Sequence, residues 1–320
     1  MNSPLRTPWQ GPMIELQQLT KVFGDTRAVN NVSFMVPRGS VFGYIGPNGA
    51  GKTTSMRILS TLELPTSGDA FIEGLSSVND PDRVRRRLGF MPDAFGTYSD
   101  TNCAEYLDFF ARSNGLVGRE RTRRLRWVMD FTGLRSMSEK PINGLSKGMR
   151  QRLCLGRALI HDPSTLILDE PAAGLDPRAR IDLRQIIRTL AADGKTILIS
   201  SHILSELAEM CDRVGIIERG TLLANDTVAG LKGKSKPHQD LIVLIDGDPT
   251  AAMQVLSEIP TVANLEHRGQ AIHFQTGVGA DRRIEILHRL CDARVRVLEY
   301  RPVDESLEDL FLKVTTGQVQ

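Results

Sequence analysis

The run GPNGAGKTT constrains the fold of this chain more than any other stretch. Its spacing, from Gly46 through Gly51 to Lys52 and Thr53, matches the phosphate loop G-x-x-x-x-G-K-[ST]. The apolar run VFGYI precedes it, and apolar residues at helical spacing follow it. Free backbone N–H groups at the start of such a helix form an anion site. A plain glycine-rich turn is the alternative, but the context predicts a nucleoside triphosphate site in an α/β fold.

The side chains of this loop have separate expected roles. Lys52 is expected to reach the β- and γ-phosphates, and the Thr53 hydroxyl is expected to ligate Mg²⁺. The residues expected to line the nucleotide here are Gly46, Pro47, Asn48, Gly49, Ala50, Gly51, Lys52, Thr53 and Thr54.

A second apolar run, LIL, ends in two adjacent carboxylates, Asp169 and Glu170. Ligands of open parallel sheets bind at the carboxyl ends of the strands, so these side chains are expected to face the nucleotide. Asp169 is predicted to hold Mg²⁺ through water, and Glu170 to polarise the water that attacks the γ-phosphate. This pairing with the phosphate loop predicts hydrolysis as well as binding.

Composition indicates a globular protein of about two domains, because the chain has 320 residues with 41% apolar and 24% charged content. A formal net charge of +2 gives no electrostatic argument for nucleic acid. No apolar run has the length of a membrane span. Residues 1–12 are interpreted as a disordered lead-in without the apolar core of a signal peptide. Four scattered cysteines favour reduced thiols, so we expect a soluble cytoplasmic protein.

The stretch NGLSKGMRQRLCLGRAL predicts another helix start. Ser146 and Gly148 precede a helical apolar pattern, and serine is a favoured N-cap. The free amides of that helix start invite an anion. Taken by itself, this stretch is better explained as a capped helix with no further role.

Five segments together resemble the ATP-binding subunits of ABC transporters. LSKGM resembles the family's LSGGQ signature, LILDEP its Walker B strand and AGLDP its D-loop. His202 in ISSHIL stands at the place of the switch histidine, and Phe23 in KVFG at the place of the aromatic ring that stacks on adenine. The resemblance runs in order from about Met13 to Lys232.

The resemblance implies a P-loop NTPase cassette that binds ATP and Mg²⁺. It implies that Ser146 and Gly148 of one copy contact the γ-phosphate of ATP held by Lys52 of a second copy, with Asp176 acting across the dimer. His202 would contact the γ-phosphate. Three of these residues also have an ordinary alternative: Phe23 as a core aromatic, His202 as an ordinary surface or core histidine, and Asp176 as a turn cap before Pro177.

The chain departs from the family pattern at three positions. Lys147 and Met149 replace a glycine and the glutamine of the signature. Asp93 stands where the family has its Q-loop glutamine, after LGFMP. We predict that Asp93 contacts the metal, directly or through water, in the ATP-loaded state. The alternative is a loop residue that only sets turn geometry.

The ABC domain is predicted to cover residues 13–232, with a helical subdomain at about 96–162. A polar linker, 233–239, leads to an accessory unit, 240–320, whose expected order βαββαβ is ferredoxin-like, with a last helix in ESLEDLFLKV. The resemblance gives this unit a role in regulation or dimer contact. In the helical subdomain we expect one helix face to border a groove for the membrane partner. This face comprises Tyr106, Leu107 and Phe110, preceded by Phe95 and Tyr98. The alternative is that these side chains only form the core of the subdomain.

The leading hypothesis is the ATP-hydrolysing motor of a membrane exporter. It would work as a homodimer on separate transmembrane permease subunits, peripheral on the inner face of the cell membrane. A soluble ABC ATPase acting on nucleic acid or ribosomes is the second hypothesis, but such proteins usually carry a long coiled coil or two cassettes. A small P-loop kinase is the third, and it would need neither Ser146 nor His202. The transported substrate is not encoded in any motif of this chain.

Overall fold

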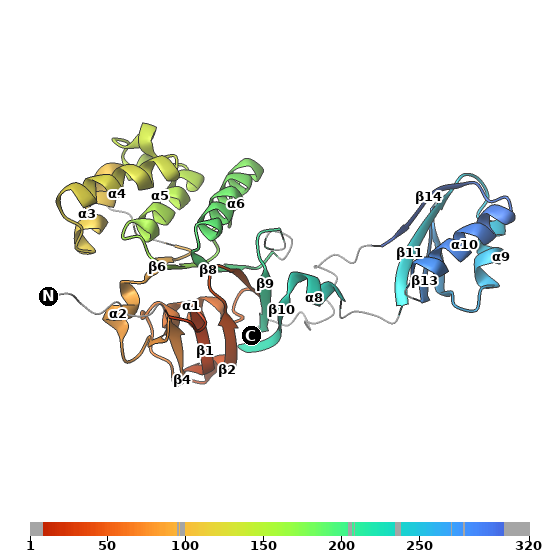
Figure 1. The fold of residues 1–320 in the computed structure, drawn as a ribbon, viewed down its shortest axis with the longest axis horizontal. Coiled ribbons are helices and arrows are strands. Elements are labelled where there is room, and N and C mark those ends of the chain that lie inside the picture. Colours follow the sequence, from red (N-terminus) through yellow and green to blue (C-terminus); the bar gives the residue numbers. More distant parts are fainter. Residues whose placement is uncertain are drawn as a thin grey trace. The chain divides into compact units, whose positions relative to one another are not determined.

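The computed structural model describes residues 9–94, 96, 100–203, 207, 209–233, 238–269, 271–277 and 279–303. The described chain forms two compact units, one extending to Val228 and the other beginning at Ala229 (Figure 1). The predicted domain boundary at 232 falls inside α8 (Val228–Gly233). Most of the predicted lead-in, most of the predicted linker and the predicted last helix lie outside the described residues.

A six-stranded sheet forms the centre of the first unit. Its strand order is β10-β9-β3-β8-β7-β6, and all neighbours are parallel except β9 and β10. Strands β3, β7 and β8 are buried along their whole length, which explains their continuous apolar runs. The strands are β3 (Val41–Ile45), β6 (Leu88–Met91), β7 (Thr165–Leu168), β8 (Thr196–Ser201), β9 (Arg213–Glu218) and β10 (Thr221–Thr227).

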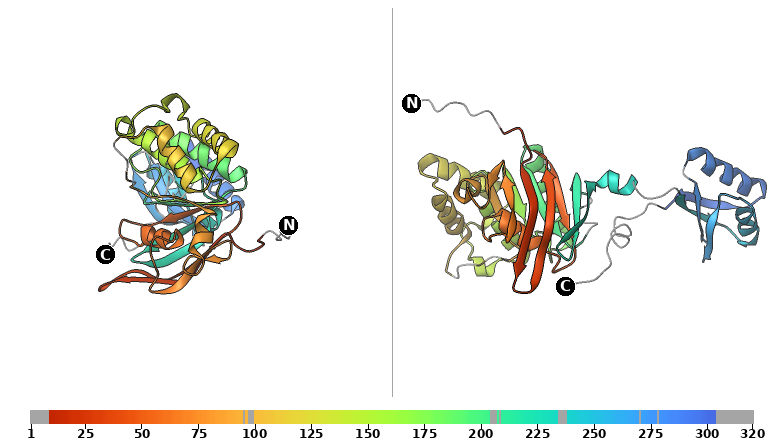
Figure 2. Two further views of the ribbon diagram at one scale, coloured as in Figure 1. Left: turned by 90° about the vertical axis from the view of Figure 1, so that its left-hand side faces the viewer. Right: turned by 90° about the horizontal axis from the view of Figure 1, so that it is seen from below.

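A four-stranded antiparallel sheet, in the order β2-β1-β4-β5, lies on one side of the central sheet. Helix α1 (Lys52–Leu59) lies between the two sheets (Figure 2). A shared apolar core joins the two sheets and the helix, and within it the rings of Phe34 and Phe42 stack at 4.9 Å. The strands are β1 (Ile14–Phe23), β2 (Thr26–Val36), β4 (Ser67–Ile72) and β5 (Leu75–Ser76).

Helices cover the other side of the central sheet (Figures 1 and 2). Between residues 100 and 162 every regular element that the structure describes is helical, as predicted for the helical subdomain. The helices of the first unit beyond α1 are α2 (Pro81–Arg85), α3 (Cys103–Ser113), α4 (Gly118–Phe131), η1 (Arg135–Met137), η2 (Ile142–Gly144), α5 (Lys147–Leu159) and α6 (Pro177–Ala192). None of the described helices combines the length and apolar character needed to cross a membrane.

The predicted partner-facing surface of α3 is wrong at two of its residues. Tyr106 and Leu107 are 1% and 0% exposed, because they face α4 and α5 and form the core of the helical part. The aromatic residue that α3 does expose is Phe109, at 54%. The two preceding aromatics of that prediction, Phe95 and Tyr98, lie outside the described residues.

The second unit contains a four-stranded antiparallel sheet in the order β12-β13-β11-β14. This order and the βαββαβ connectivity agree with the ferredoxin-like prediction. The sheet and its two helices share a separate apolar core. The elements are β11 (His238–Ile245), α9 (Thr250–Ser257), β12 (Ala263–Arg268), β13 (Ala271–Gly277), α10 (Ala280–Asp292) and β14 (Val297–Pro302).

Candidate functional site

The site lies where four neighbouring parallel strands end. The phosphate loop follows β3, His202 follows β8, the pair Asp169 and Glu170 follows β7, and Asp93 comes shortly after β6. Parallel strands deliver their carboxyl ends to one edge of the sheet, so residues far apart in sequence meet there. The sheet order therefore explains why four predicted segments converge.

Backbone geometry shows why the phosphate loop requires glycine. Gly51 has φ +100°, and a Cβ there would lie 2.3 Å from the Ala28 carbonyl oxygen. A Cβ on Gly46 would lie 2.2 Å from the Ile217 carbonyl oxygen. Side chains at these positions would push the loop away from the sheet. Glycine thus holds the loop tightly against its neighbours and leaves its amides bare.

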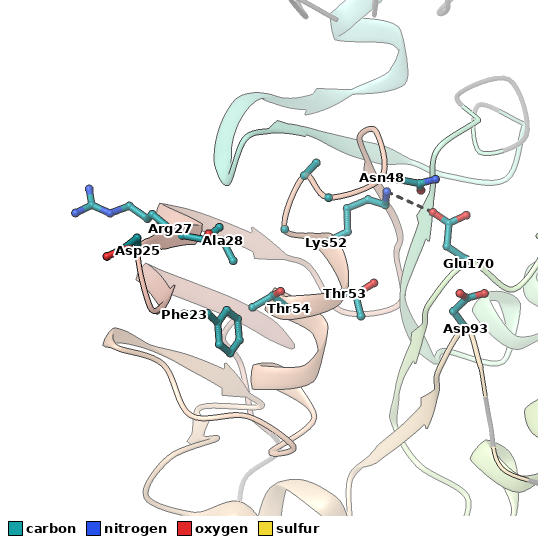
Figure 3. Close-up of a pocket in the computed structure, with 14 residues that line it drawn as sticks. Phe23, Asp25, Arg27, Ala28, Asn48, Lys52, Thr53, Thr54, Asp93 and Glu170 are labelled. Carbon is teal, nitrogen blue, oxygen red and sulfur yellow. Dashed lines mark ion pairs between the residues drawn. The ribbon is translucent and has the colours of Figure 1, made fainter. Parts of the chain in front are cut away.

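Lys52 is held inside the loop by oxygen atoms. Its ammonium donates to the carbonyl oxygens of Gly46 at 2.6 Å and Pro47 at 3.2 Å. The Glu170 carboxylate lies 3.4 Å away, shown as the dashed line in Figure 3. Burial lowers the pKa of Lys52, and the Glu170 charge acts against that shift. The lysine is therefore positioned before any phosphate arrives.

Glu170 connects Lys52 to His202. Its Oε2 lies 2.9 Å from His202 Nδ1, while Oε1 is the atom nearest Lys52. The Glu170 backbone has φ +48°, which is unusual for a residue other than glycine. Strain of this kind is found where surrounding contacts fix a functional side chain. Lys52, Glu170 and His202 therefore form one connected group.

Asp169 is the most deeply buried acid of the site, at 1% exposure. Burial raises its pKa, and a hydrogen bond from Ser200 opposes the rise. The Thr53 side chain also lies close enough to lower this pKa. Among the described residues, Asp169 Oδ2 has no hydrogen-bond partner. A buried carboxylate oxygen without a partner, next to a hydroxyl, fits a hard divalent cation.

Ser200 is a site residue that the sequence analysis missed. Its hydroxyl donates to Asp169 Oδ1 at 2.7 Å and accepts from the Glu170 backbone N–H at 2.8 Å. Ser200 is fully buried in β8. The available signal was a polar residue at the end of the apolar strand TILISS, two positions before His202. One hydroxyl thus holds the Asp169 carboxylate and the backbone of Glu170.

A cleft of about 690 Å³ extends from Glu170 and Asp93 to the end of β1. Phe23 lines it with 46% of its surface exposed, which contradicts the core-aromatic alternative. Phe23 and Asp93 lie on either side of the first turn of α1 (Figure 3). The lining residues are Phe23, Asp25, Thr26, Arg27, Ala28, Asn48, Gly49, Ala50, Gly51, Lys52, Thr53, Thr54, Asp93 and Glu170. Those from 25 to 28 were not predicted.

Seven predicted site residues do not line this cleft: Gly46, Pro47, Asp169 and His202, and also Ser146, Gly148 and Asp176, which stand at the starts of α5 and α6. Ser146 caps α5 by accepting from the Met149 N–H at 3.3 Å. Asp176 caps α6 by accepting from the Ala179 N–H at 2.9 Å. Both capping side chains are exposed.

The starts of α5 and α6 lie together. A Cβ on Gly148 would come within 3.7 Å of Ala179, and Arg152 pairs with Asp182 at 2.6 Å. Ser146, Gly148 and Asp176 therefore belong to one surface that is separate from the cleft. We call this the signature surface.

The comparisons with known proteins agree with this arrangement. The chain matches the sequence model of the family described as ABC transporter over residues 29–173. A model described as "AAA domain, putative AbiEii toxin, Type IV TA system" matches residues 139–208. An ATP-binding subunit of an ABC transporter has a similar structure, with 30% identity and a TM-score of 0.63 over 69% of this chain and 92% of that chain.

A dimeric ATP-binding cassette in a post-hydrolysis state with ADP and Pi is similar at 25% identity and a TM-score of 0.62, over 68% of this chain and 99% of that chain.

Similar proteins of known sequence have names that refer to transport. The Nod factor export ATP-binding protein I of Ralstonia nicotianae is 33% identical over 97% of this chain and 95% of its own length. The bacitracin transport ATP-binding protein BcrA of Bacillus licheniformis is 33% identical over 95% and 98%. A probable multidrug ABC transporter ATP-binding protein, YbhF of Escherichia coli, is 38% identical over 70% of this chain, which spans 38% of that protein's length. The chain therefore belongs to the ABC transporter family, as an ATPase subunit.

Proposed function

We propose that two copies of this chain close around two ATP molecules, and that each ATP lies between the cleft of one copy and the signature surface of the other. One observation carries this proposal. The cleft contains a phosphate loop and a catalytic carboxylate, yet no residue of α5 or α6 lines it. On the signature surface, Ser146 and Asp176 are exposed, and a helix start suits an anion. A two-fold dimer brings both surfaces together twice.

Within each site, Glu170 is the base. It accepts a proton from water while the water oxygen bonds to the γ-phosphorus and the bond from that phosphorus to the β–γ bridging oxygen breaks. His202 holds the Glu170 carboxylate through the 2.9 Å contact and faces the γ-phosphate. Lys52, pre-positioned by the Gly46 and Pro47 carbonyls, stabilises the charge on the β- and γ-phosphates.

Mg²⁺ would be held by Thr53 and Asp169, with Asp93 as a further contact in the ATP-loaded state. Among the described residues, no group of three or more His, Cys, Asp or Glu side chains could hold a metal by protein ligands alone. Mg²⁺ in phosphate sites is bound through one or two protein groups together with phosphate oxygens and water, so this donor set fits. The ion neutralises the charge that develops on the phosphates.

The proposed partners at the membrane are separate transmembrane permease subunits, which places the chain peripherally on the inner face of the cell membrane. The names of the full-length relatives, for Nod factor export and bacitracin transport, support export as the process. Both relatives are 33% identical to this chain, so the comparison does not favour either cargo. We propose Phe109 as the α3 residue that faces the permease, because it is the exposed aromatic there.

The second compact unit is proposed to act in regulation or in dimer contact. It has its own apolar core, and the nucleotide cleft is lined entirely by residues of the first unit. The site that hydrolyses ATP therefore does not require it for chemistry.

The dependence of ATPase rate on protein concentration tests the dimer. If the site forms between two copies, the rate per chain should rise with concentration and then level off, because the dimer assembles by mass action. Sedimentation of the same samples with ATP should show dimer over the same concentration range. A constant rate per chain while the protein sediments as a monomer would contradict the proposal.

A further inference from the structure

A lysine lies over the ring of Phe23. The Lys21 ammonium is 4.7 Å from the ring centroid. The same ammonium donates to Glu63 Oε1 and to the Leu64 carbonyl oxygen, both at 2.8 Å. Three independent contacts therefore fix one cation above this ring.

These contacts are well shielded from solvent, although they lie at the edge of a cleft. The Lys21 side chain is only 13% exposed, although lysine is usually among the most exposed residues. The backbone supports the same arrangement: the Val22 N–H donates to Thr66 Oγ1 at 3.0 Å, and the Thr66 N–H donates to the Thr20 carbonyl at 2.8 Å. The end of β1 is thus tied to the turn at 60–66.

We propose that Lys21, fixed by Glu63, is a positioning residue that covers one face of the Phe23 ring and so presents the other face to the base of the nucleotide. Phe23 lines the cleft and is 46% exposed despite this cover. The face away from Lys21 is therefore the one that a flat ligand can use. This inference rests on the adenine stack at Phe23 that belongs to the proposed function.

Two physical effects favour stacking on a ring held this way. The ammonium attracts the negative face of the ring, which restricts the ring's motion before the ligand binds. It also offsets part of the negative charge density that would repel the face of a second π-system. Both effects act on the base and not on the phosphates.

The turn that holds Lys21 also leads back to the phosphate loop. Helix α1 begins at Lys52 and ends at Leu59, directly before the 60–66 turn. The Phe23 ring, held through Lys21 and the 60–66 turn, and the phosphate loop are therefore connected to opposite ends of one short helix. A ligand with both a base and a triphosphate can use both ends, whereas a triphosphate alone uses only one.

The experiment compares the affinity for ATP with the affinity for inorganic tripolyphosphate, by calorimetry without Mg²⁺ so that no hydrolysis occurs. Lys21→Met keeps the aliphatic stem but removes the charge, and Lys21→Arg keeps a cation that can lie on the ring. Lys195→Met is the matched control, since Lys195 is also 13% exposed and donates to Asp162 Oδ1 at 2.9 Å and the Pro163 carbonyl at 2.7 Å.

Lys21→Met should weaken ATP binding about two- to fivefold and leave tripolyphosphate binding unchanged. Lys21→Arg should keep most of the ATP affinity, and Lys195→Met should change neither ligand. Equal weakening of both ligands in Lys21→Met, or no weakening of ATP, would overturn the inference. Phe23→Ala tests the adenine stack separately from the role of Lys21. If Phe23→Ala leaves the ratio of the ATP and tripolyphosphate affinities unchanged, the proposed adenine stack is wrong as well.

Discussion

The cleft and the signature surface differ in how far hydrogen bonds and ion pairs within this chain organise their polar side chains. In the cleft and directly beside it, polar groups contact one another: Lys52 pairs with Glu170, Glu170 contacts His202, and Ser200 donates a hydrogen bond to Asp169. On the signature surface, the side chain of Ser146 is exposed and its recorded hydrogen bond serves only its own helix start. The first region is organised by contacts among its own side chains, whereas in the second Ser146 and Asp176 cap their own helices.

This difference assigns separate tasks to the two regions. Preorganised groups act on the charge that develops during reaction, because they need no rearrangement at that moment. An exposed helix start can respond to whether a γ-phosphate is present, since its dipole attracts an anion. Loss of that phosphate can therefore release one copy from the other. In the proposed dimer, the cleft would carry out the chemistry, and the contact with the signature surface would couple that chemistry to motion.

The largest effect should come from Glu170→Gln within the cleft. The amide keeps the shape of the side chain but cannot accept the proton from water, so hydrolysis should fall by about 100-fold or more. ATP binding should persist, and the arrested protein should elute as an ATP-dependent dimer in size-exclusion chromatography. Turnover near that of the unaltered chain would remove Glu170 from its role as base.

A smaller effect is expected from Ser146→Ala on the signature surface. Loss of one hydrogen bond to a charged phosphate should lower the ATPase rate about tenfold or more, without changing the ATP affinity of the monomer. The same substitution also removes an N-cap, at a cost of about 1 kcal/mol of folding stability.

Asn102→Ala is the matched control for that cost. Asn102 caps α3 by accepting from the Glu105 N–H at 2.9 Å and does not line the cleft. Both variants should show a similar fall in thermal melting temperature, but only Ser146→Ala should lose ATPase activity. Equal activity losses in Ser146→Ala and Asn102→Ala would mean that Ser146 acts only as a helix cap.

The smallest effect should come from Asp93→Asn. If Asp93 contacts the metal, removal of its charge should raise the Mg²⁺ concentration for half-maximal ATPase about fivefold, because an exposed charge pair is worth about 1 kcal/mol. ATP affinity measured without metal should change little. Asp25→Asn, an acid that also lines the cleft, is the control. Equal Mg²⁺ requirements in Asp93→Asn and the unaltered chain would leave Asp93 as a turn residue.

Sequence reasoning could predict what depends on local patterns. The phosphate loop and the carboxylate pair are predictable because each follows an apolar strand. The strand order of the second unit follows from its βαββαβ sequence. The roles of Ser200 and of the Lys21–Glu63 pair are not predictable from the sequence, because each depends on a contact with a strand or turn that is distant along the chain. The buried face of α3 was misjudged because apolar spacing marks a buried side but does not say what covers it.

A mixing experiment tests the shared site most directly. Lys52→Ala disables the cleft, and Ser146→Ala disables the signature surface, so each variant alone should be nearly inactive. In a mixed dimer, the intact cleft of the Ser146→Ala chain meets the intact signature surface of the Lys52→Ala chain. An equal mixture forms about half mixed dimers with one working site each, so it should recover about a quarter of the unaltered rate. A mixture that is no more active than its two components would contradict a site built from two copies.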